Sequence, residues 1–264
     1  MSTMAETLLV TGAAGRIGGM LRPRLARADR TLRLLDVAAI DDPGEREEVV
    51  TASVTDLDAL THACRGVDAV VHLGGISGEA AWSEILEVNI GGTFTVLEAA
   101  RRAGVPRVVF ASSNHAVGFH PAVDPVPDDL PPRPDTFYGV SKVTGEALGS
   151  LFHDRYGLDV VCLRIGTCFE EPPDARALAT WLSPDDVARL VDAAVTVRAP
   201  GFRVVWGVSD NTRRRWSLTA AAELGYRSGD DAEVFADRDL PTDPWTDAFV
   251  GGGFCGPRYD EPGV

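Results

Sequence analysis

The sequence predicts an α/β fold in which helices cover both faces of one doubly wound parallel sheet. Over the first two thirds of the chain, short apolar runs alternate with helical patterns, which is typical of βαβ units. The apolar run Ala69–Leu73 has no polar residue until His72, as expected of a strand buried on both faces. Residues 1–165 are therefore expected to form one domain, and residues 166–264 a small, discontinuous C-terminal region.

The first 112 residues contain five strand patterns and three helix patterns. Strands are predicted at Thr7–Thr11, Leu32–Asp36, Glu48–Ala52, Ala69–Leu73 and Arg107–Ser112. Helices are predicted at Ile17–Ala28, Leu57–Cys64 and Ile85–Ala103. Gly104 marks the end of the last helix, because glycine readily adopts the left-handed conformation that terminates helices.

The second half begins with a proline-rich loop and then resumes the alternation. Gly118–Arg133 contains five prolines, which predict an extended loop. Further elements are predicted as a helix at about Phe137–Tyr156, a strand at Asp159–Ile165, a helix capped by Ser183-Pro184, a strand at Phe202–Trp206 and a helix near Trp216–Leu224. One strand and one helix of this region are expected to return to the sheet, and about the last 30 residues to be irregular.

Composition excludes several classes of protein. The chain of 264 residues has 39 acidic and 25 basic residues, a net charge of −14 that disfavours nucleic acid and anionic membranes as partners. Its apolar runs are far shorter than the ~20 residues of a membrane helix, and its start shows no signal-peptide pattern. Four scattered cysteines suggest neither a zinc site nor disulfides, so no metal and a reducing cytoplasm are expected.

The spacing Gly12-x-x-Gly15-x-x-Gly18 follows the first predicted strand and precedes the first helix. Such glycines let backbone amides approach a pyrophosphate at the positive end of a helix, so a nucleotide cofactor is expected here. Asp36 ends the second strand, where a carboxylate would accept hydrogen bonds from the adenosine ribose and repel a 2′-phosphate. NAD is therefore favoured over NADP, with Arg16 or Arg33 as the alternative that would bind a 2′-phosphate.

Tyr138 and Lys142 are four residues apart in a predicted helix, so their side chains share one face. Lys142 is the one lysine of the chain, and arginine supplies all the other basic residues. A compact ammonium beside the phenol would favour its ionised form and lower its pKa from about 10. The pair therefore predicts a catalytic base, Tyr138, supported by the charge of Lys142.

Three polar residues, Ser113, Asn114 and His115, follow the fifth predicted strand. They are expected at the carboxyl edge of the sheet, where ligands bind in folds of this kind. Ser113 could hold a substrate hydroxyl beside the phenolate. A Ser–His hydrolase is disfavoured, because the sequence contains no Gly-x-Ser-x-Gly elbow.

Together these motifs resemble the extended short-chain dehydrogenase/reductase superfamily, whose members have a Rossmann fold. The matching residues are Thr11-Gly12-x-x-Gly15-x-x-Gly18, Asp36, Asp56-Leu57, His72-Leu-Gly-Gly75, Asn89, Ser113 and Tyr138-x-x-x-Lys142. The resemblance implies a sheet order of 3-2-1-4-5-6-7, with Ser113, Tyr138 and Lys142 as catalytic residues. It also implies a cofactor site that consists of Gly12, Ala14, Gly15, Arg16, Ile17, Gly18, Asp36, Asp56, Leu57, Leu73, Gly74, Gly75, Asn89, Tyr138 and Lys142.

A narrower resemblance covers nearly the whole chain. The stretches that resemble the uronate dehydrogenase family are His72–Ser77, Phe110–His115, Tyr138–Lys142, Arg164–Cys168, Asp174–Asp186 and Gly251–Phe254. This resemblance implies that NAD oxidises the C1 hydroxyl of D-glucuronate or D-galacturonate to an aldarolactone. The substrate-binding residues that it implies are Ser77, Ser113, Asn114, His115, Tyr138, Thr167, Arg176 and Phe254.

The sequence departs from that family at three places. Thr167 stands where a serine is expected, which keeps the hydroxyl, and Arg213–Trp216 and the shortened tail before Phe254 also differ. Since a bidentate arginine is a natural partner for a carboxylate, Arg176 is expected to bind the sugar acid. The alternatives are a sugar epimerase or another sugar dehydrogenase of the superfamily, and a non-catalytic NAD-sensing regulator. A homo-oligomer is also expected.

Overall fold

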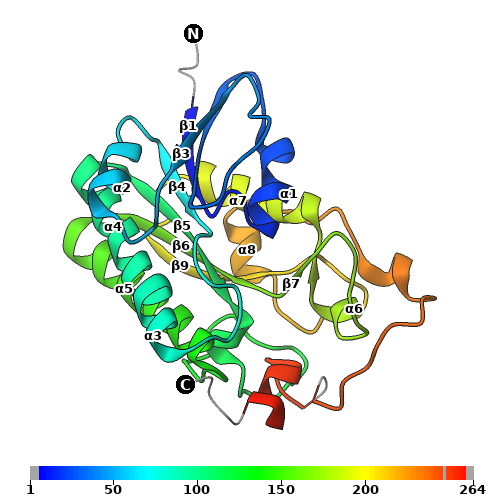
Figure 1. Ribbon diagram of the computed structural model, residues 1–264. Helices are drawn as coiled ribbons and strands as arrows, with labels where there is room; N and C mark the ends of the chain where they lie inside the picture. The colour runs from blue at the N-terminus through cyan, green and yellow to red at the C-terminus, as the bar shows by residue number, and fades with distance from the viewer. Residues whose placement is uncertain (1–5, 246–247, 260–264) are drawn as a thin grey trace.

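The computed structural model describes residues 6–245 and 248–259. Its main sheet has seven parallel strands in the order β3-β2-β1-β4-β5-β6-β9 (Figure 1). Their bounds are β1 Glu6–Thr11, β2 Arg30–Asp36, β3 Glu47–Thr51, β4 Ala69–His72, β5 Arg107–Ser113, β6 Asp159–Ile165 and β9 Phe202–Gly207. The predicted fold class and strand order are confirmed. The seventh strand of the sheet is β9, because β7 (Thr167–Cys168) and β8 (Trp181–Leu182) form a separate parallel pair.

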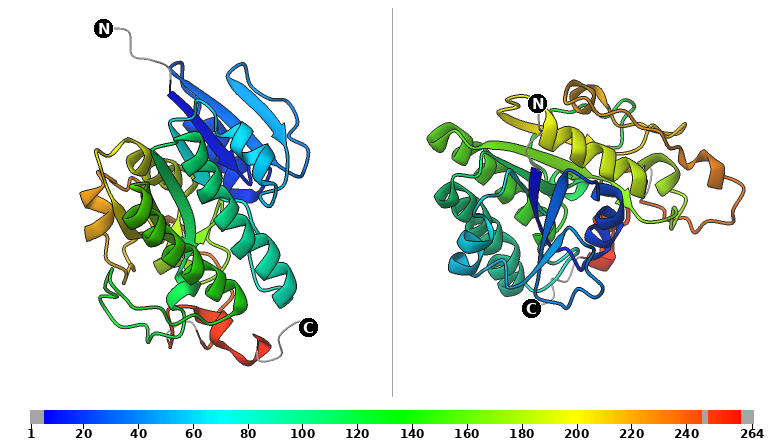
Figure 2. Two further views of the ribbon diagram at one scale, coloured as in Figure 1. Left: turned by 90° about the vertical axis from the view of Figure 1, so that its left-hand side faces the viewer. Right: turned by 90° about the horizontal axis from the view of Figure 1, so that it is seen from above.

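Helices cover both faces of the sheet (Figures 1 and 2). One face carries α1 (Arg16–Leu25), α7 (Pro184–Thr196) and α8 (Thr219–Glu223), and the other carries α2 (Leu57–Ala63), α4 (Gly92–Ala103) and α5 (Phe137–Tyr156). Successive strand residues point to opposite faces. In β1, Leu8 and Val10 therefore belong to the core beneath α1 and α7, whereas Leu9 belongs to the core beneath α2 and α4.

Three predicted helices differ in extent. The first ends at Leu25 because Ala26 is extended, with φ −63° and ψ 123°. The long central helix begins earlier, as α3 (Trp82–Glu84), and passes through a π-helical stretch (Ile85–Gly91) before α4 ends at left-handed Gly104. The helix expected near Trp216–Leu224 is confined to α8, since Trp216 instead packs on Trp206 with 4.5 Å between ring centres. Helix α6 (Ala177–Thr180), β7 and β8 lie in a segment for which no element was predicted.

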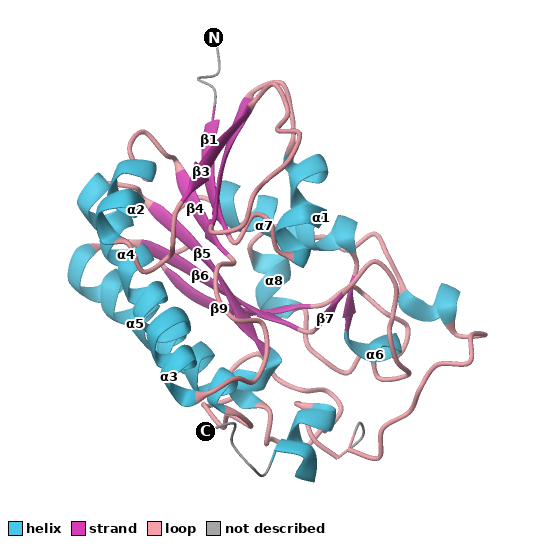
Figure 3. Ribbon diagram, in the orientation of Figure 1, coloured by secondary structure: helices cyan, strands magenta, loops and turns pink. Residues whose placement is uncertain are grey.

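About the last 30 residues were expected to be irregular; the described ones among them contain two short 3-10 helices, Gly252–Cys255 and Pro257–Tyr259, and residues 248–256 lie against the loop that follows β5 (Figure 3). The amide of Val250 donates to the His120 carbonyl, and the amide of Gly251 donates to the Gly118 carbonyl, both at 2.9 Å. Residues 248–256 are thereby brought to the carboxyl edge of the sheet. Within residues 6–245 and 248–259, no helix is long and apolar enough to cross a membrane.

A buried ion pair joins α5 to two strands. Glu146 on α5 accepts hydrogen bonds of 2.9 and 2.8 Å from Arg164 of β6, and one of 2.6 Å from Ser112 of β5. Glu146 is 6% and Arg164 4% exposed. Since a buried charge without partners is costly, these bonds determine how α5 is seated on the sheet.

Glu146→Gln is expected to lower the free energy of unfolding by about 3 kcal/mol or more, because it leaves the buried guanidinium of Arg164 without its counter-charge. The matched control is Glu48→Gln, which removes a pair with Arg33 in which the carboxylate side chain is 53% exposed; its cost should be about 0–1 kcal/mol. Urea unfolding measures both. Equal losses would mean that the buried pair does not anchor α5.

Candidate active site

The loop between β1 and α1 brings backbone segments unusually close together. Gly12 has a φ of 70°, and a Cβ on it would lie 2.7 Å from the backbone nitrogen of Gly74. A Cβ on Gly18 would lie 2.5 Å from the carbonyl oxygen of Gly12. Helix α1 has no side-chain cap at Gly15, so its N-terminal amides can bind a pyrophosphate. Ala14, Gly15 and Arg16 are exposed at this point, and Ile17 is half-buried.

Asp36, at the end of β2, lies directly beside this loop. Its Oδ2 accepts a hydrogen bond of 2.9 Å from the Ala14 amide, and its Oδ1 accepts one of 3.0 Å from the Ala38 amide. Each carboxylate oxygen can accept a second bond, so two remain for ribose hydroxyls. The exposed amides at the start of α1 suit the pyrophosphate of a dinucleotide. The Asp36 carboxylate suits an adenosine ribose that carries no 2′-phosphate.

The two arginines considered for a 2′-phosphate have other contacts. Arg16 lies over the Phe169 ring, with its guanidinium carbon 3.9 Å from the ring centre. Arg33 donates to Glu48 at 2.8 Å and to the carbonyls of Ala63 and Arg65 at 2.6 and 2.9 Å. These contacts favour NAD over NADP.

The other predicted cofactor residues lie at the start of α2 and in the loop after β4. Exposed Asp56 caps α2, accepting from the amides of Asp58 and Ala59 at 3.1 and 3.0 Å, and Leu57 beside it is half-buried. After β4, the loop Leu73–Ser77 passes Gly74 and Gly75, which are part-buried and exposed.

Buried Asn89 supports this loop from the π-helical stretch. Its side chain accepts from the Ile76 amide at 2.7 Å and donates to the Ile76 carbonyl at 3.0 Å. A Cβ on Gly75 would lie 3.0 Å from the Asn89 Oδ1. Asn89 therefore acts on the edge of the cofactor site by holding the loop.

Ser113, Tyr138 and Lys142 meet where β5 ends. Ser113 is the last residue of β5, and Tyr138 and Lys142 lie one turn apart at the start of α5. The Lys142 Nζ donates to the Ala111 carbonyl at 2.8 Å and lies 5.2 Å from the centre of the Tyr138 ring. The Ser113 Oγ accepts from the His115 amide at 3.2 Å, and the serine side chain lies near enough to Tyr138 to lower the pKa of the phenol. The structure thus brings the three predicted catalytic residues together.

The ionisation of this cluster differs from the expected one. Burial raises the pKa of Tyr138 to about 12, and the nearby Ser113 hydroxyl opposes the rise only in part. Burial also lowers the pKa of Lys142 to about 8. The shift of Tyr138 is opposite to the lowering expected from Lys142, because desolvation penalises the phenolate more than nearby groups favour it.

His115 is held by a carboxylate that sequence reasoning did not single out. Its Nδ1 is 2.7 Å from the Oδ2 of Asp135, whose side chain is fully buried. A Cβ on Gly118 or Gly251 would lie 1.9 or 2.0 Å from that oxygen, so only glycines leave room for the carboxylate. The available signal was an acidic residue directly before the helix-capping Thr136.

The aromatic side chains of the site surround the His115 ring. Its centre lies 4.1 Å from that of Phe254 and 5.8 Å from that of Tyr138. Phe254 also stacks on Tyr259, with 4.5 Å between ring centres. The structure therefore brings Phe254 to the predicted substrate residues despite the shortened tail that precedes it.

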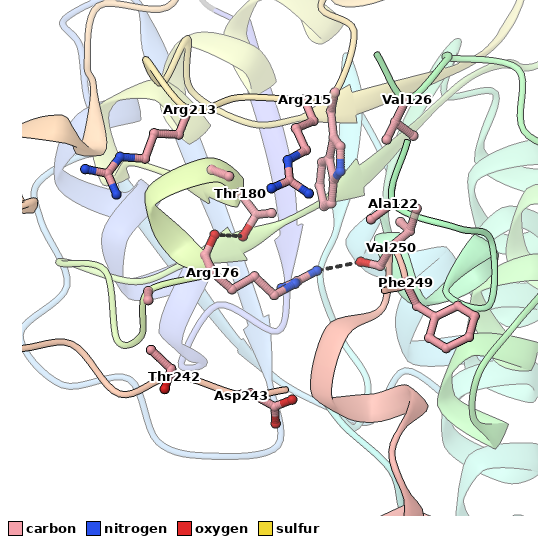
Figure 4. A pocket seen from close by; sticks show the side chains of 13 residues that line it. Ala122, Val126, Arg176, Thr180, Arg213, Arg215, Thr242, Asp243, Phe249 and Val250 are labelled. Atoms are coloured by element: carbon pink, nitrogen blue, oxygen red, sulfur yellow. Dashed lines mark hydrogen bonds between the residues drawn. The ribbon is translucent and has the colours of Figure 1, made fainter. Parts of the chain in front are cut away.

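Arg176 is joined to the residues after β5 through one backbone oxygen. Its Nη2 donates to the Val250 carbonyl at 2.6 Å (Figure 4). The Asn114 Nδ2 donates to the same carbonyl at 3.2 Å. Its Nη1 lies 3.4 Å from the Thr167 Oγ1. Burial lowers the pKa of Arg176, and within the part of the chain that the structure describes no carboxylate forms an ion pair with it. This guanidinium is therefore suited to an external carboxylate.

Ser77 is exposed in the loop after β4, and Glu79, two residues further on, docks this loop on α5. The carboxylate of Glu79 accepts from the amides of Phe137 and Tyr138 at 3.1 and 2.8 Å. Sequence reasoning missed Glu79, because only the fold brings it to the first turn of a helix 58 residues later.

The chain belongs to the NAD dependent epimerase/dehydratase family, whose family model matches residues 8–173. Among its relatives, uronate dehydrogenase from Pseudomonas syringae pv. tomato is 45% identical over 234 residues, which are 88% of this chain and 85% of that protein. Uronate dehydrogenase from Agrobacterium fabrum is 42% identical over 249 residues, 93% and 94% of the two chains.

Solved structures agree with these relatives. A crystal structure of uronate dehydrogenase from Agrobacterium tumefaciens has a TM-score of 0.90 at 41% identity and covers 98% of both chains. A mutant of that enzyme complexed with NAD also has a TM-score of 0.90 at 41% identity, covering 97% of this chain and 98% of its own. The resemblance inferred from the motifs and the expected cofactor, NAD, are confirmed.

Gly18→Ala is expected to weaken NAD binding by about tenfold or more, equivalent to about 1.4 kcal/mol, because the added Cβ would push α1 away from the Gly12 carbonyl. The matched control is Gly19→Ala in the same helix, where a Cβ would meet no atom within 4 Å. Calorimetric titration with NAD measures both variants. Equal affinities in the two variants would show that close packing at Gly18 is not needed for the cofactor.

Proposed function

We propose that this NAD-dependent oxidoreductase oxidises the C1 hydroxyl of a free hexuronate, D-glucuronate or D-galacturonate, to the aldarolactone. The observation that carries the proposal is the placement of Arg176, without an ion-pair partner in the described chain, beside Asn114 and Thr167. The likeness to named uronate dehydrogenases over most of the chain supports it.

The proposed chemistry is a proton removal by the chain and a hydride transfer to the cofactor. NAD, when bound, accepts a hydride from C1. Tyr138, as phenolate, takes the proton of the C1 hydroxyl, and Ser113 orients that hydroxyl. Lys142 has three N–H donors, of which one is used by the Ala111 carbonyl. The others are free to stabilise the phenolate and to hold the nicotinamide ribose.

Substrate recognition is proposed to be local. Arg176 binds the carboxylate, and the remaining contacts to the sugar come from Ser77, Ser113, Asn114, His115, Tyr138, Thr167 and Phe254. The net charge of −14 repels an anionic substrate at long range, so the half-buried guanidinium of Arg176 must provide the attraction at the site. With its Nδ1 directed at Asp135, His115 has its Nε2 left for a sugar hydroxyl.

The proposal extends to the organisation of the protein. Residues 1–165 would hold NAD, and residues 166–264 mainly the substrate. A reducing cytoplasm suits its four cysteines, which are all buried and free. Leu86, Phe94 and Leu151, which are 46%, 47% and 47% exposed, lie on neighbouring helical segments and support a homo-oligomer.

Tyr138→Phe should lower kcat for uronate oxidation by roughly 10²–10⁴-fold, the usual contribution of a positioned base. NAD affinity should change by less than about twofold, because the phenol ring remains in place. NADH absorbance measures turnover, and release of NADH in proportion to uronate consumed separates a dehydrogenase from an epimerase. Retention of more than about a tenth of the activity would contradict the assignment of Tyr138 as base.

The pH profile provides a further check on the same residue. Because burial holds the pKa of Tyr138 at about 12, the phenolate fraction grows with pH and kcat/KM should rise through the neutral range. The rise should flatten as Lys142, whose pKa is about 8, loses the charge that supports the phenolate. A profile that falls between about pH 6 and 8 is the contrary outcome.

Arg176→Ala should lower kcat/KM for uronates by roughly 10- to 150-fold, because a hydrogen bond to a charged group is worth about 1.5–3 kcal/mol. Glucose and galactose, which lack the carboxylate, are the control substrates. Wild type should oxidise them very poorly, and the variant should leave that residual rate unchanged. An equal loss on both classes would make Arg176 structural, and wild-type oxidation of glucose as fast as glucuronate would refute the uronate proposal.

A further inference from the structure

The Asp135 carboxylate connects three separate segments of the chain at the proposed substrate site. Its Oδ2 lies 2.7 Å from the His115 Nδ1 and 3.8 Å from the Cys255 Sγ, in the loop after β5 and the C-terminal segment. Its Oδ1 accepts from the Thr136 Oγ1 at 3.0 Å. Thr136 in turn caps α5, because its hydroxyl accepts from the Gly139 amide at 3.0 Å. All side-chain groups around Asp135 are therefore donors to it.

The bond to Asp135 determines which nitrogen of His115 carries the proton. A carboxylate can only accept, so the proton shared by the two side chains lies on Nδ1. A neutral imidazole has one N–H, so its Nε2 has a lone pair and can only accept. Within residues 6–245 and 248–259, no group is hydrogen-bonded to this Nε2, and the histidine side chain is 13% exposed. His115 therefore presents an acceptor to a ligand.

Two aromatic rings keep this acceptor beside the phenol. Phe254 lies against the His115 ring, with 4.1 Å between ring centres. The Tyr138 ring lies edge-on to it, at 5.8 Å and an interplanar angle of 67°. Asp135 and Tyr138 are also linked through the first turn of α5, which Thr136 caps. A sugar whose C1 hydroxyl is bound at the phenol therefore has His115 as a close neighbour.

The chemistry of a hexuronate identifies the group that can meet this acceptor. In the pyranose form, C1 is bonded to two ring atoms, which are the ring oxygen and C2. The ring oxygen has no hydrogen and can only accept, whereas the C2 hydroxyl can donate. With the C1 hydroxyl at Tyr138, the Nε2 of His115 can therefore pair with the C2 hydroxyl and not with the ring oxygen. Glucuronate and galacturonate have the same configuration at C2 and differ at C4.

We propose that Asp135 is a positioning residue that fixes the tautomer of His115, whose Nε2 thereby accepts a hydrogen bond from the C2 hydroxyl of the sugar acid. The inference rests on the proposed function, since it requires the C1 hydroxyl at Tyr138. It makes the C2 hydroxyl a determinant of specificity that both 4-epimers satisfy. A substituent at C2 that cannot donate leaves the Nε2 lone pair without a partner, which disfavours that substrate.

The test compares glucuronate with 2-deoxy-2-fluoroglucuronate, whose fluorine replaces the C2 hydroxyl and cannot donate. NADH absorbance gives kcat/KM for each at about pH 8, where an imidazole is ordinarily neutral. Fluorine also slows hydride loss from C1 in every variant. The quantity compared between variants is therefore the ratio of the two kcat/KM values, and wild type should favour glucuronate.

Two variants alter the acceptor in different ways. His115→Asn keeps an N–H for Asp135, because the asparagine amide nitrogen matches the place of Nδ1, but it has no atom at the place of Nε2. In Asp135→Asn, the Thr136 hydroxyl keeps the amide oxygen on its own side, so the amide nitrogen donates to Nδ1 and the imidazole proton moves to Nε2. In each variant the preference for glucuronate should fall by about fivefold or more. Asp135→Asn should also raise kcat/KM for the fluoro sugar, a gain that a structural defect does not produce.

The matched control is Asp159→Asn, at the amino end of β6. Asp159 accepts from the Arg107 guanidinium at 3.1 Å, and its side chain is 21% exposed. The change removes the same charge at the opposite edge of the sheet, so the preference for glucuronate should stay within about twofold of wild type. Calorimetric titration with NAD identifies a variant that has not folded, and the other variant then decides the outcome.

Three results separate this inference from the proposed function. If both variants lower kcat/KM for the two sugars by equal factors, Asp135 and His115 are structural and the inference is overturned. If the preference falls in His115→Asn but keeps its wild-type value in Asp135→Asn, the control of the tautomer by Asp135 is refuted. If wild type does not oxidise glucuronate, the proposed function fails, and with it the placement of C1 on which the inference rests.

Discussion

The positions of Tyr138 and Lys142 at the carboxyl edge of the sheet depend on the buried carboxylate of Glu146. Glu146 follows Lys142 by one helical turn and Tyr138 by two, so the three side chains lie in a row along one face of α5. Its bonds to Ser112 and Arg164 hold that face against β5 and β6. A rotation of α5 would break these bonds and leave charges buried without partners. The positions of the Tyr138 phenol and the Lys142 ammonium are therefore fixed by bonds that neither residue makes.

The burial that positions Tyr138 and Lys142 also opposes the charges that the proposed mechanism requires of them. The pKa of Tyr138 is raised to about 12 and that of Lys142 is lowered to about 8, both by desolvation. Each shift favours the neutral form, and the two charges would stabilise one another if formed together. Asp135, which holds His115 at 2.7 Å, adds to the rise at Tyr138, so precise placement of the histidine also makes the phenol harder to ionise.

The parts of the fold and site that follow from local pattern could be predicted from the sequence. Strands buried on both faces, the glycine spacing and the four-residue interval from Tyr138 to Lys142 are visible in a short window, and the structure has them as expected. Contacts between distant segments could not be predicted in this way. Glu79 reaches the amide of Tyr138 only through the fold, and the acceptor at Val250 is a backbone carbonyl, which every residue type provides.

That carbonyl determines the order in which the binding site can be completed. Asn114 and Arg176 both donate to residue 250, which lies 136 positions after Asn114 and 74 after Arg176. A growing chain can complete the sheet once β9 has formed, while this acceptor has yet to be synthesised. The residues that would bind the nucleotide and those proposed to bind the sugar acid are thus completed at different stages of synthesis, and the second set requires a segment that follows the last strand of the sheet.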